Sequence, residues 1–319
     1  MTATLTALVS QIRYEAKDIH SIELHPVGAT AFPAFEAGSH IDLHLGNGQV
    51  RSYSLFNPAG ETHRYCVGVL KDAKSRGGSR WVHEQLRVGS TLTISAPRNN
   101  FPLQEGADHS VLVAGGIGIT PILCMGRRLQ ALGRPFEVLY FARSQPHAAF
   151  VAEVEALGAP VHWHFDDARG GPPDLRALLA ARPAGANTHY YACGPAVMLD
   201  AFEKNCADLG YTKAHIERFA AVEVKAAADA RSGFTVILKQ SGMEFTVTAD
   251  QTLLQALRAN GVEPVTSCED GICGACETQV LEGLPDHRDS VLSKAEREAN
   301  KTMMICVGGC KSERLVLAL

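Results

Sequence analysis

Apolar and polar positions follow one period in the first third of the chain. From Leu5 to about Leu103, short runs alternate apolar and polar side chains between turn signals that stand roughly ten residues apart. Alternation with a period of two is typical of half-buried strands. We expect strands at 21–24, 40–45, 64–69 and 91–94, in an antiparallel barrel or sandwich.

The middle of the chain follows a different pattern, in which continuous apolar runs alternate with helical segments. Val111–Ala114 is apolar throughout, as in a parallel strand that is buried on both faces, and a glycine loop and a helix follow it. Further strands are expected at 136–141, 161–165 and 188–191, with helices near 148–157, 174–181 and 195–209. The alternation predicts βαβ units around a parallel sheet.

A change of composition precedes the last stretch and reads as a linker. The predicted domains are therefore residues 1–103, 104–224 and 233–319, with 225–232 as the linker. A length of 319 residues exceeds what one core normally supports, which agrees with two or three domains.

Composition narrows the class of protein. Apolar residues make up 46% and charged residues 20%, which is ordinary for a soluble globular protein. A net charge of −4 argues against a nucleic-acid partner. The sequence has neither a long apolar window nor a signal peptide pattern, so we expect no membrane partner and a cytoplasmic location. Cysteines outside the motif below are scattered among apolar runs, which fits a reducing compartment.

Four cysteines carry the strongest chemical signal: Cys268, Cys273, Cys276 and Cys306. The first three form C-x4-C-x2-C, and 29 residues separate the third from the fourth, which is the plant-type spacing for a [2Fe-2S] cluster. Gly271 and Gly274 permit the sharp bends that such a loop needs.

Other interpretations of these cysteines remain. A zinc site usually shows a second C-x2-C or a histidine pair, and only one C-x2-C is present. Four buried cysteines without a ligand are a further alternative. Cys310 competes for the fourth position, but Cys306 directly follows the apolar run Met303–Ile305 and is therefore expected at the end of a buried strand.

Two stretches of the first domain suggest a flavin site. Arg51 and Tyr53 share one face of an expected strand, with Ser52 and Ser54 between and after them, and could bind an anion and a planar ring. The run Arg76, Gly77, Gly78 and Ser79 opens an expected helix at 81–86, where free N–H groups favour a phosphate. Each stretch alone has a plainer interpretation, as an ordinary strand and an ordinary helix cap.

The second domain suggests a dinucleotide site. The loop that contains Gly115, Gly116, Gly118, Thr120 and Pro121 resembles G-x-G-x-x-G but has proline in place of the third glycine. Glycines let backbone approach a pyrophosphate, and the helix N-terminus stabilises its charge.

Two further positions in this domain follow strands. Asp166 ends the third strand, where an acid can bind the adenosine ribose and favours NADH over NADPH; an ordinary solvated acid is the alternative. Cys193, Gly194 and Pro195 end the fourth strand, at the sheet edge where ligands bind.

Taken together, these motifs resemble the phthalate dioxygenase reductase family, which includes the reductase components of vanillate demethylase-type Rieske oxygenases. The resemblance covers essentially the whole chain in order. It implies a multidomain fold: an antiparallel β-barrel flavin domain, an α/β parallel-sheet nucleotide-binding domain, and an α+β plant-type ferredoxin domain of the β-grasp type.

The resemblance also implies roles for single residues. FMN rather than FAD is implied, with Arg51, Ser52, Tyr53 and Ser54 at the flavin and residues 76–79 at its phosphate. Phe219 would cover the isoalloxazine ring, although Arg218 stands where the family typically has serine. Cys193 would approach the nicotinamide, so Cys193 and Phe219 are the expected catalytic residues.

The implied activity is an NADH-dependent electron-transfer reductase. Electrons would pass from NADH to FMN, then to the [2Fe-2S] cluster and on to a Rieske-type terminal oxygenase, with the flavin converting a two-electron donor to a one-electron acceptor. Acids near the cluster loop, Glu269, Asp270 and Glu277, would face this partner in a weak, salt-dependent encounter. The alternatives are a general NADH–ferredoxin or quinone reductase and a redox sensor, although no output domain is recognisable.

Overall fold

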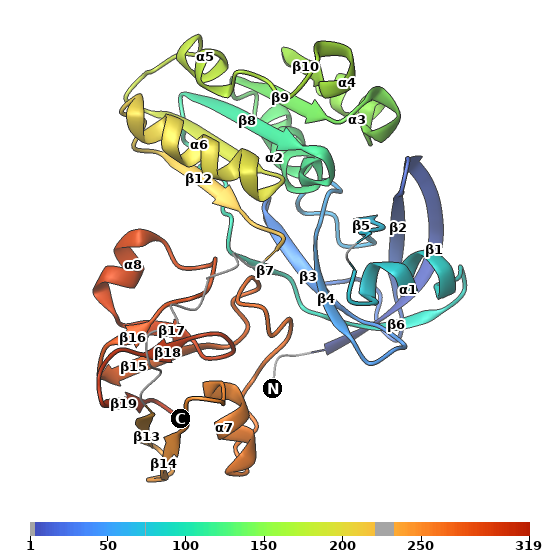
Figure 1. Cartoon of the computed structure of the whole chain (residues 1–319). Coiled ribbons are helices and arrows are strands. Elements are labelled where there is room, and N and C mark those ends of the chain that lie inside the picture. The colour runs from blue at the N-terminus through green and yellow to red at the C-terminus, as the bar shows by residue number, and fades with distance from the viewer. Residues whose placement is uncertain (1–3, 74, 221–232) are drawn as a thin grey trace. The chain divides into compact units, whose positions relative to one another are not determined.

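The computed structural model describes residues 4–73, 75–220 and 233–319, so the expected linker at 225–232 lies outside the described residues. The chain divides into two compact units, Thr2–Phe219 and Ala220–Leu319 (Figure 1).

The first part of the larger unit is an antiparallel sheet, coloured blue to cyan in Figure 1. Its order is β4-β3-β6-β1-β2-β5, with β7 on β3. A bridge between Leu55 and Val67 joins the two ends of this path, so the sheet closes on itself as a barrel. The strands are β1 (Thr4–Ala16), β2 (Ile19–Pro26), β3 (Ser39–His44), β4 (Val50–Ser54), β5 (Tyr65–Leu70), β6 (Thr91–Ser95) and β7 (Arg98–Asn99), and helix α1 (Gly78–Gln85) lies between β5 and β6 in the chain.

The second part of this unit is a parallel sheet of order β10-β9-β8-β11-β12. Its strands are β8 (His109–Gly115), β9 (Phe136–Ala142), β10 (Val161–Phe165), β11 (Thr188–Cys193) and β12 (Ala214–Glu217). Its helices are η1 (Gly116–Gly118), α2 (Ile119–Ala131), η2 (Gln145–His147), α3 (Val151–Glu155), α4 (Asp166–Arg169), α5 (Leu175–Ala180) and α6 (Ala196–Asp208). The expected parallel α/β sheet is confirmed, and β12 is an additional strand.

Burial on both faces explains why the centre of β8, Val111–Ala114, is apolar at every position. Val111 and Val113 pack with residues of α5 and α6, whereas Leu112 and Ala114 pack with residues of α2, α3 and the barrel. Successive side chains of a strand point to opposite faces, so a sheet covered on both sides needs continuous apolar runs.

The barrel and the parallel sheet share one core. Phe56, just after β4, packs against Phe150, just before α3, with ring centroids 4.6 Å apart. Gly68 of β5 lies so close to the methyl group of Thr120 that a Cβ there would stand 2.7 Å from it. The expected boundary near residue 103 thus falls between β7 and β8, inside a single compact unit.

The C-terminal unit is a mixed sheet of order β14-β13-β19-β15-β17, with helices α7 (Leu253–Ala259) and α8 (Lys294–Ala299). Strands β13 and β19 run parallel and the other pairs antiparallel. This α+β arrangement agrees with the expected ferredoxin-like domain. The strands are β13 (Phe234–Leu238), β14 (Glu244–Val247), β15 (Glu277–Glu282), β17 (Thr302–Met304) and β19 (Arg314–Leu317), with a separate pair β16 (Pro285–Asp286) and β18 (Gly309–Cys310).

Among the described residues, no helix combines the length and the apolar character needed to cross a membrane.

Candidate functional site

The four motif cysteines are brought together in the C-terminal unit, and all four are buried. Cys268 and Cys273 lie in the loop between α7 and β15, and Cys276 directly precedes β15. Because Glu277 of β15 pairs with Met304 of β17, the chain just after β17 brings Cys306 beside Cys276. The expectation that a buried strand delivers Cys306 agrees with this geometry.

The thiols are arranged as two pairs. A hydrogen bond from the Cys306 thiol lowers the pKa of Cys276, and the same contact raises the pKa of Cys306. The Cys273 thiol likewise raises the pKa of Cys268. In the part of the chain that the structure describes, no three His, Cys, Asp or Glu side chains converge on a point that could hold one metal ion.

Two pairs of thiols fit two irons, each taking one pair, better than one tetrahedral zinc ion, which needs its ligands around a single point. Cys310 is not in this group, since its thiol donates to the Ser312 carbonyl oxygen at 3.1 Å.

The loop around the thiols depends on its glycines. Gly271 and Gly274 have φ of 69° and 72°, which favours glycine. A Cβ on Gly271 would also stand 2.6 Å from the Val307 side chain. The Asp270 amide points at the Cys268 sulfur, 3.4 Å away. Backbone N–H groups aimed at sulfur are what a cluster with thiolate ligands requires.

In the larger unit, the structure joins the two stretches that suggested a flavin site. A Cβ on Gly78, the first residue of α1, would stand 2.8 Å from Cγ of Arg51, so Arg51 packs directly on the glycine pair. The hairpin before β4 supports this loop, because Gln49 donates to the carbonyl oxygen of Arg76 at 2.6 Å. Gly77 has φ of 112°. An arginine beside the uncapped N-terminus of a helix fits a phosphate group.

The other residues of β4 are engaged differently. Ser52 donates to the buried Asp42 at 2.7 Å, so its hydroxyl is part of the barrel. Burial raises the pKa of Tyr53 to about 12, and its ring packs on the core. Ser79 accepts a hydrogen bond from the Asp72 amide at 3.2 Å, which leaves its own hydroxyl proton available for a ligand.

Glu217 lies at the candidate site, although the sequence patterns did not predict it there. It ends β12, pairs with Cys193 of β11, and its carboxylate accepts a hydrogen bond from Ser54 Oγ at 3.0 Å. Burial raises the pKa of Glu217 to about 8, and burial together with the Glu217 charge raises the pKa of the Cys193 thiol well above its usual value. The only hint in the sequence is an acid that follows two apolar residues in strand alternation, Ala214 and Ile216.

The glycine loop after β8 is built mainly for close packing. A Cβ on Gly118 would stand 2.1 Å from the carbonyl oxygen of Cys193, and one on Gly115 would stand 2.7 Å from Pro195. Gly116 faces open space and has φ of 54°. Thr120 and Pro121 are buried in the first turn of α2. Gly116 is therefore the position at which this loop leaves room for a ligand.

Strand order places these residues at one edge of the sheet. All five strands are parallel, so the ends of β8, β11 and β12 lie side by side. Strand order reverses between β8 and β11, where the Gly115 and Cys193 loops meet, and such switch points bind ligands in open α/β sheets. Asp166 directly follows β10 at the same edge, and its carboxylate lies 3.5 Å from His164.

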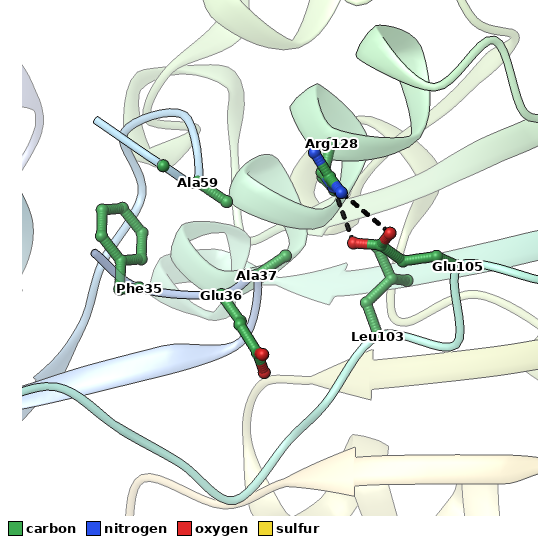
Figure 2. Close-up of a pocket in the computed structure, with 8 residues that line it drawn as sticks. Phe35, Glu36, Ala37, Ala59, Leu103, Glu105 and Arg128 are labelled. Atoms are coloured by element: carbon green, nitrogen blue, oxygen red, sulfur yellow. Dashed lines mark hydrogen bonds and ion pairs between the residues drawn. The ribbon is translucent and has the colours of Figure 1, made fainter. Parts of the chain in front are cut away.

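A hollow of about 430 Å³ lies elsewhere in this unit (Figure 2). Figure 2 shows Phe35 and Ala59 on one side and a two-bond ion pair between Arg128 and Glu105 on the other, with N–O distances of 2.6 and 2.9 Å. No predicted site residue lines this hollow, so we assign it no part in the chemistry.

Comparison with known proteins supports the assignment of both units. Residues 236–309 match the family model of the 2Fe-2S iron-sulfur cluster binding domain. The chain is 45% identical over 317 residues to a phenoxybenzoate dioxygenase subunit beta of Ectopseudomonas oleovorans, covering 99% of this chain and 98% of the relative. It is 45% identical to a vanillate O-demethylase oxidoreductase of a Pseudomonas species (99% and 100% covered). It is 47% identical to a tetrachlorobenzoquinone reductase of Sphingobium chlorophenolicum (99% and 98% covered).

Solved structures agree with this. Phthalate dioxygenase reductase, titled a modular structure for electron transfer from pyridine nucleotides to [2Fe-2S], superposes with a TM-score of 0.72 at 35% identity, with 99% of this chain and 98% of that chain covered. An intact type IV self-sufficient cytochrome P450 monooxygenase matches at a TM-score of 0.91 and 41% identity, and this chain spans 41% of its length. The chain therefore belongs to the phthalate dioxygenase reductase family of flavin iron-sulfur oxidoreductases, the family that its sequence motifs resemble.

Proposed function

We propose that the chain is the NADH-dependent reductase component of a Rieske-type aromatic oxygenase or demethylase system. The observation that carries the proposal is the presence, in one chain, of a phosphate cradle at Arg51 and Gly78, a switch-point site at Cys193 and Glu217, and two pairs of buried thiols. When bound, FMN accepts a hydride from NADH and the [2Fe-2S] cluster carries single electrons onward.

The chain's own residues bind and orient these groups. The N-terminus of α1 and Arg51 would hold the FMN phosphate, and Tyr53 and Phe219 offer aromatic surface to the flavin ring. Phe219 is 38% exposed, although phenylalanine is usually buried, and this exposure leaves its ring accessible to a ligand.

The nicotinamide would lie at the switch point between β8 and β11. Cys193 is fully buried there, beside Gly194 and Gly118, so the backbone and not the thiol anion would meet the ligand. Ser54 and Glu217 form a fixed hydrogen-bonded pair beside this position, and such fixed groups orient reacting rings without a rearrangement.

Asp166 supports NADH rather than NADPH. It follows β10 at the carboxyl edge, and its carboxylate is partly exposed and so able to accept bonds from ribose hydroxyls. A 2′-phosphate would be repelled by the same charge.

The proposed electron acceptor is a Rieske-type oxygenase that binds transiently to the cluster loop. Relatives at 45% identity are named as parts of a dioxygenase and of a demethylase system. In this chain Glu277 is exposed beside Cys276, and Glu269 forms an ion pair with Arg258 at 2.6 Å. An acidic rim steers a basic partner and weakens with salt.

An anaerobic titration tests the proposal. The purified chain is titrated with NADH and, separately, with NADPH, while flavin and iron-sulfur absorbance are followed and the flavin released on denaturation is identified. We expect NADH to reduce both centres with about three electrons per chain and FMN to be released. Reduction by NADPH alone, or flavin reduction that never reaches the iron-sulfur bands, would contradict the proposal.

A second candidate is direct reduction of quinones, favoured by the 47% identity to a tetrachlorobenzoquinone reductase. The two functions differ in the centre that passes electrons to the final acceptor. Substituting Cys306 abolishes transfer to an oxygenase, which needs the cluster, whereas quinone reduction at the flavin would continue. Quinone turnover faster than oxygenase-coupled turnover in the intact chain would favour the second candidate.

A further inference from the structure

Arg218 directly follows strand β12, and its side chain is bound to helix α6. Its Nη2 donates to Asp200 at 2.8 Å and to Glu203 at 2.6 Å, both on α6. The arginine side chain is only 10% exposed, whereas the two acids are 68% and 52% exposed. We call this three-residue contact the Arg218 clamp.

The register of β12 puts the clamp and the site on opposite sides of one strand end. Ile216 packs with the core cluster that contains residues of α6, and Arg218, two residues on, also reaches α6. Glu217 lies between them and points the other way, to Ser54 of the barrel. Alternation along a strand explains this division. The end of β12 is therefore held from both faces.

Stability alone is a weak reason for this clamp. Ion pairs with largely exposed acids contribute little. Within the described residues, Nη1 of Arg218 is buried and has no hydrogen-bond partner, which is unfavourable. An apolar side chain on α6 would stabilise the fold without leaving a buried donor unpaired. The guanidinium instead fixes the orientation of the strand end, because its Nη2 donates to two acids at once.

The clamp also connects the two strand ends that form the site. Helix α6 begins directly after Cys193-Gly194-Pro195, and the clamp ties the end of β12 to the second and third turns of that helix. Cys193 and Glu217 are paired neighbours in the sheet. Strand β11, helix α6 and the end of β12 thus form one rigid corner.

We propose that Arg218 is a positioning residue for hydride transfer, because its clamp on Asp200 and Glu203 fixes Glu217 and the following Phe219 relative to Cys193. The inference rests on the proposed function, since it concerns the geometry between nicotinamide and flavin. Misplacement by about 1 Å is enough to slow such a reaction about a hundredfold, while binding through the rest of the dinucleotide persists.

The test compares Arg218→Gln with a matched control in the flavin-loaded, cluster-loaded chain. Arg176 also reaches α6 from a neighbouring element, but at its other end, with 3.5 Å to Asp208, and it is 56% exposed. Anaerobic rapid mixing with NADH separates the limiting rate of flavin reduction from the dissociation constant of NADH. Visible circular dichroism of the bound flavin reports its surroundings independently of turnover.

For Arg218→Gln we expect the limiting rate to fall at least about tenfold and the dissociation constant to change less than about threefold. The flavin dichroism should change, Arg176→Gln should behave like the parent chain, and Arg218→Lys should recover part of the rate. The double variant Asp200→Asn with Glu203→Gln, which keeps Arg218, should show the same fall.

An unchanged limiting rate in either clamp variant would overturn the inference, as would an equal fall in Arg176→Gln. If Arg218→Gln loses its flavin, the double variant decides between these outcomes. A parent chain that NADH does not reduce would instead refute the proposed function, and the inference with it.

Discussion

Cys306 and Cys310 lie four residues apart, yet only one of them belongs to the thiol group. Cys306 is buried and hydrogen-bonded to Cys276, whereas Cys310 is partly exposed and bonded to Ser312. A short separation along the chain therefore does not decide which thiol joins the group. The strand that leads into each cysteine decides it, since β17 pairs with β15 beside Cys276 and β18 pairs with β16.

Substitution of these two cysteines should have opposite results. Cys306→Ala should lose most of the iron and the visible iron-sulfur absorbance, because one iron would keep a single thiolate. Cys310→Ala should keep both. Iron and acid-labile sulfide per chain, measured with the absorbance spectrum, check this, and equal loss in the two variants would mean that the fourth ligand is wrongly assigned.

Glu217 should make the stability of the larger unit depend on pH. Its pKa in the fold is about 8, raised by burial, against 4.5 ordinarily. Between these values the folded chain holds a proton that the unfolded chain releases, so stability falls as pH rises and the loss is complete above about pH 8. Glu217→Gln cannot ionise, and should therefore be more stable than the parent at pH 9 by about 3 kcal/mol but similar at pH 4.5.

Urea unfolding of both chains at the two pH values measures this difference. Glu155→Gln, at an exposed position, serves as the control. Parallel stability curves for the parent and Glu217→Gln would show that the carboxyl is not held in its buried environment.

At the scale of elements, the glycine motif of the β8–η1–α2 segment resembles a dinucleotide-binding motif, but two of its glycines serve close packing. Gly115 and Gly118 allow the loop after β8 to touch the loop after β11, and the touching backbones form the floor of the switch point. The N-terminus of α2 still follows directly, so Gly116 and the helix dipole remain for a dinucleotide. The roles proposed for single residues of this loop remain predictions.

A methyl group on Gly118 should disrupt this floor. In Gly118→Ala the new Cβ would meet the carbonyl oxygen of Cys193 at 2.1 Å, and backbone cannot move aside as a flexible side chain can. We expect a loss of about 3 kcal/mol in unfolding free energy and weaker NADH binding. Gly106→Ala, where nothing lies within 4 Å, should change neither quantity in denaturant unfolding and NADH titration.

At the scale of the whole molecule, the chain divides by compactness into two units. The barrel and the parallel sheet share aromatic and aliphatic contacts such as Phe56–Phe150, whereas the C-terminal unit has a core of its own around Leu257, Met303 and Leu315. The residues proposed to bind flavin and nucleotide thus lie in one unit, and the cysteines proposed to bind iron lie in the other.

Calorimetry should accordingly detect two unfolding transitions. Loss of the cluster in Cys306→Ala should lower the transition of the C-terminal unit by more than about 10 °C, because bound metal contributes to its folding free energy. The transition of the larger unit, identified by release of its flavin, should move by less than about 2 °C. A single transition that shifts as a whole would show that the two units unfold together.

The sequence by itself determined what is encoded locally. The cysteine spacing predicts the metal ligands because three of the four cysteines lie in one loop. The two hydrophobic periods separate barrel from parallel sheet because each period reflects which faces are buried. The sequence does not predict strand β12, because a strand of four residues with only two apolar positions is too short to show a period.

Only the tertiary structure decided which distant residues act together. Ser54 and Glu217 are 163 positions apart, and Gly118 meets Cys193 across a parallel crossover, so no local pattern links either pair. The pairing of the thiols and the Arg218 clamp likewise depend on strand neighbours. The sequence specifies the chemistry of each side chain. The burial, the pKa and the contacts of that side chain arise only when strand order brings distant segments side by side.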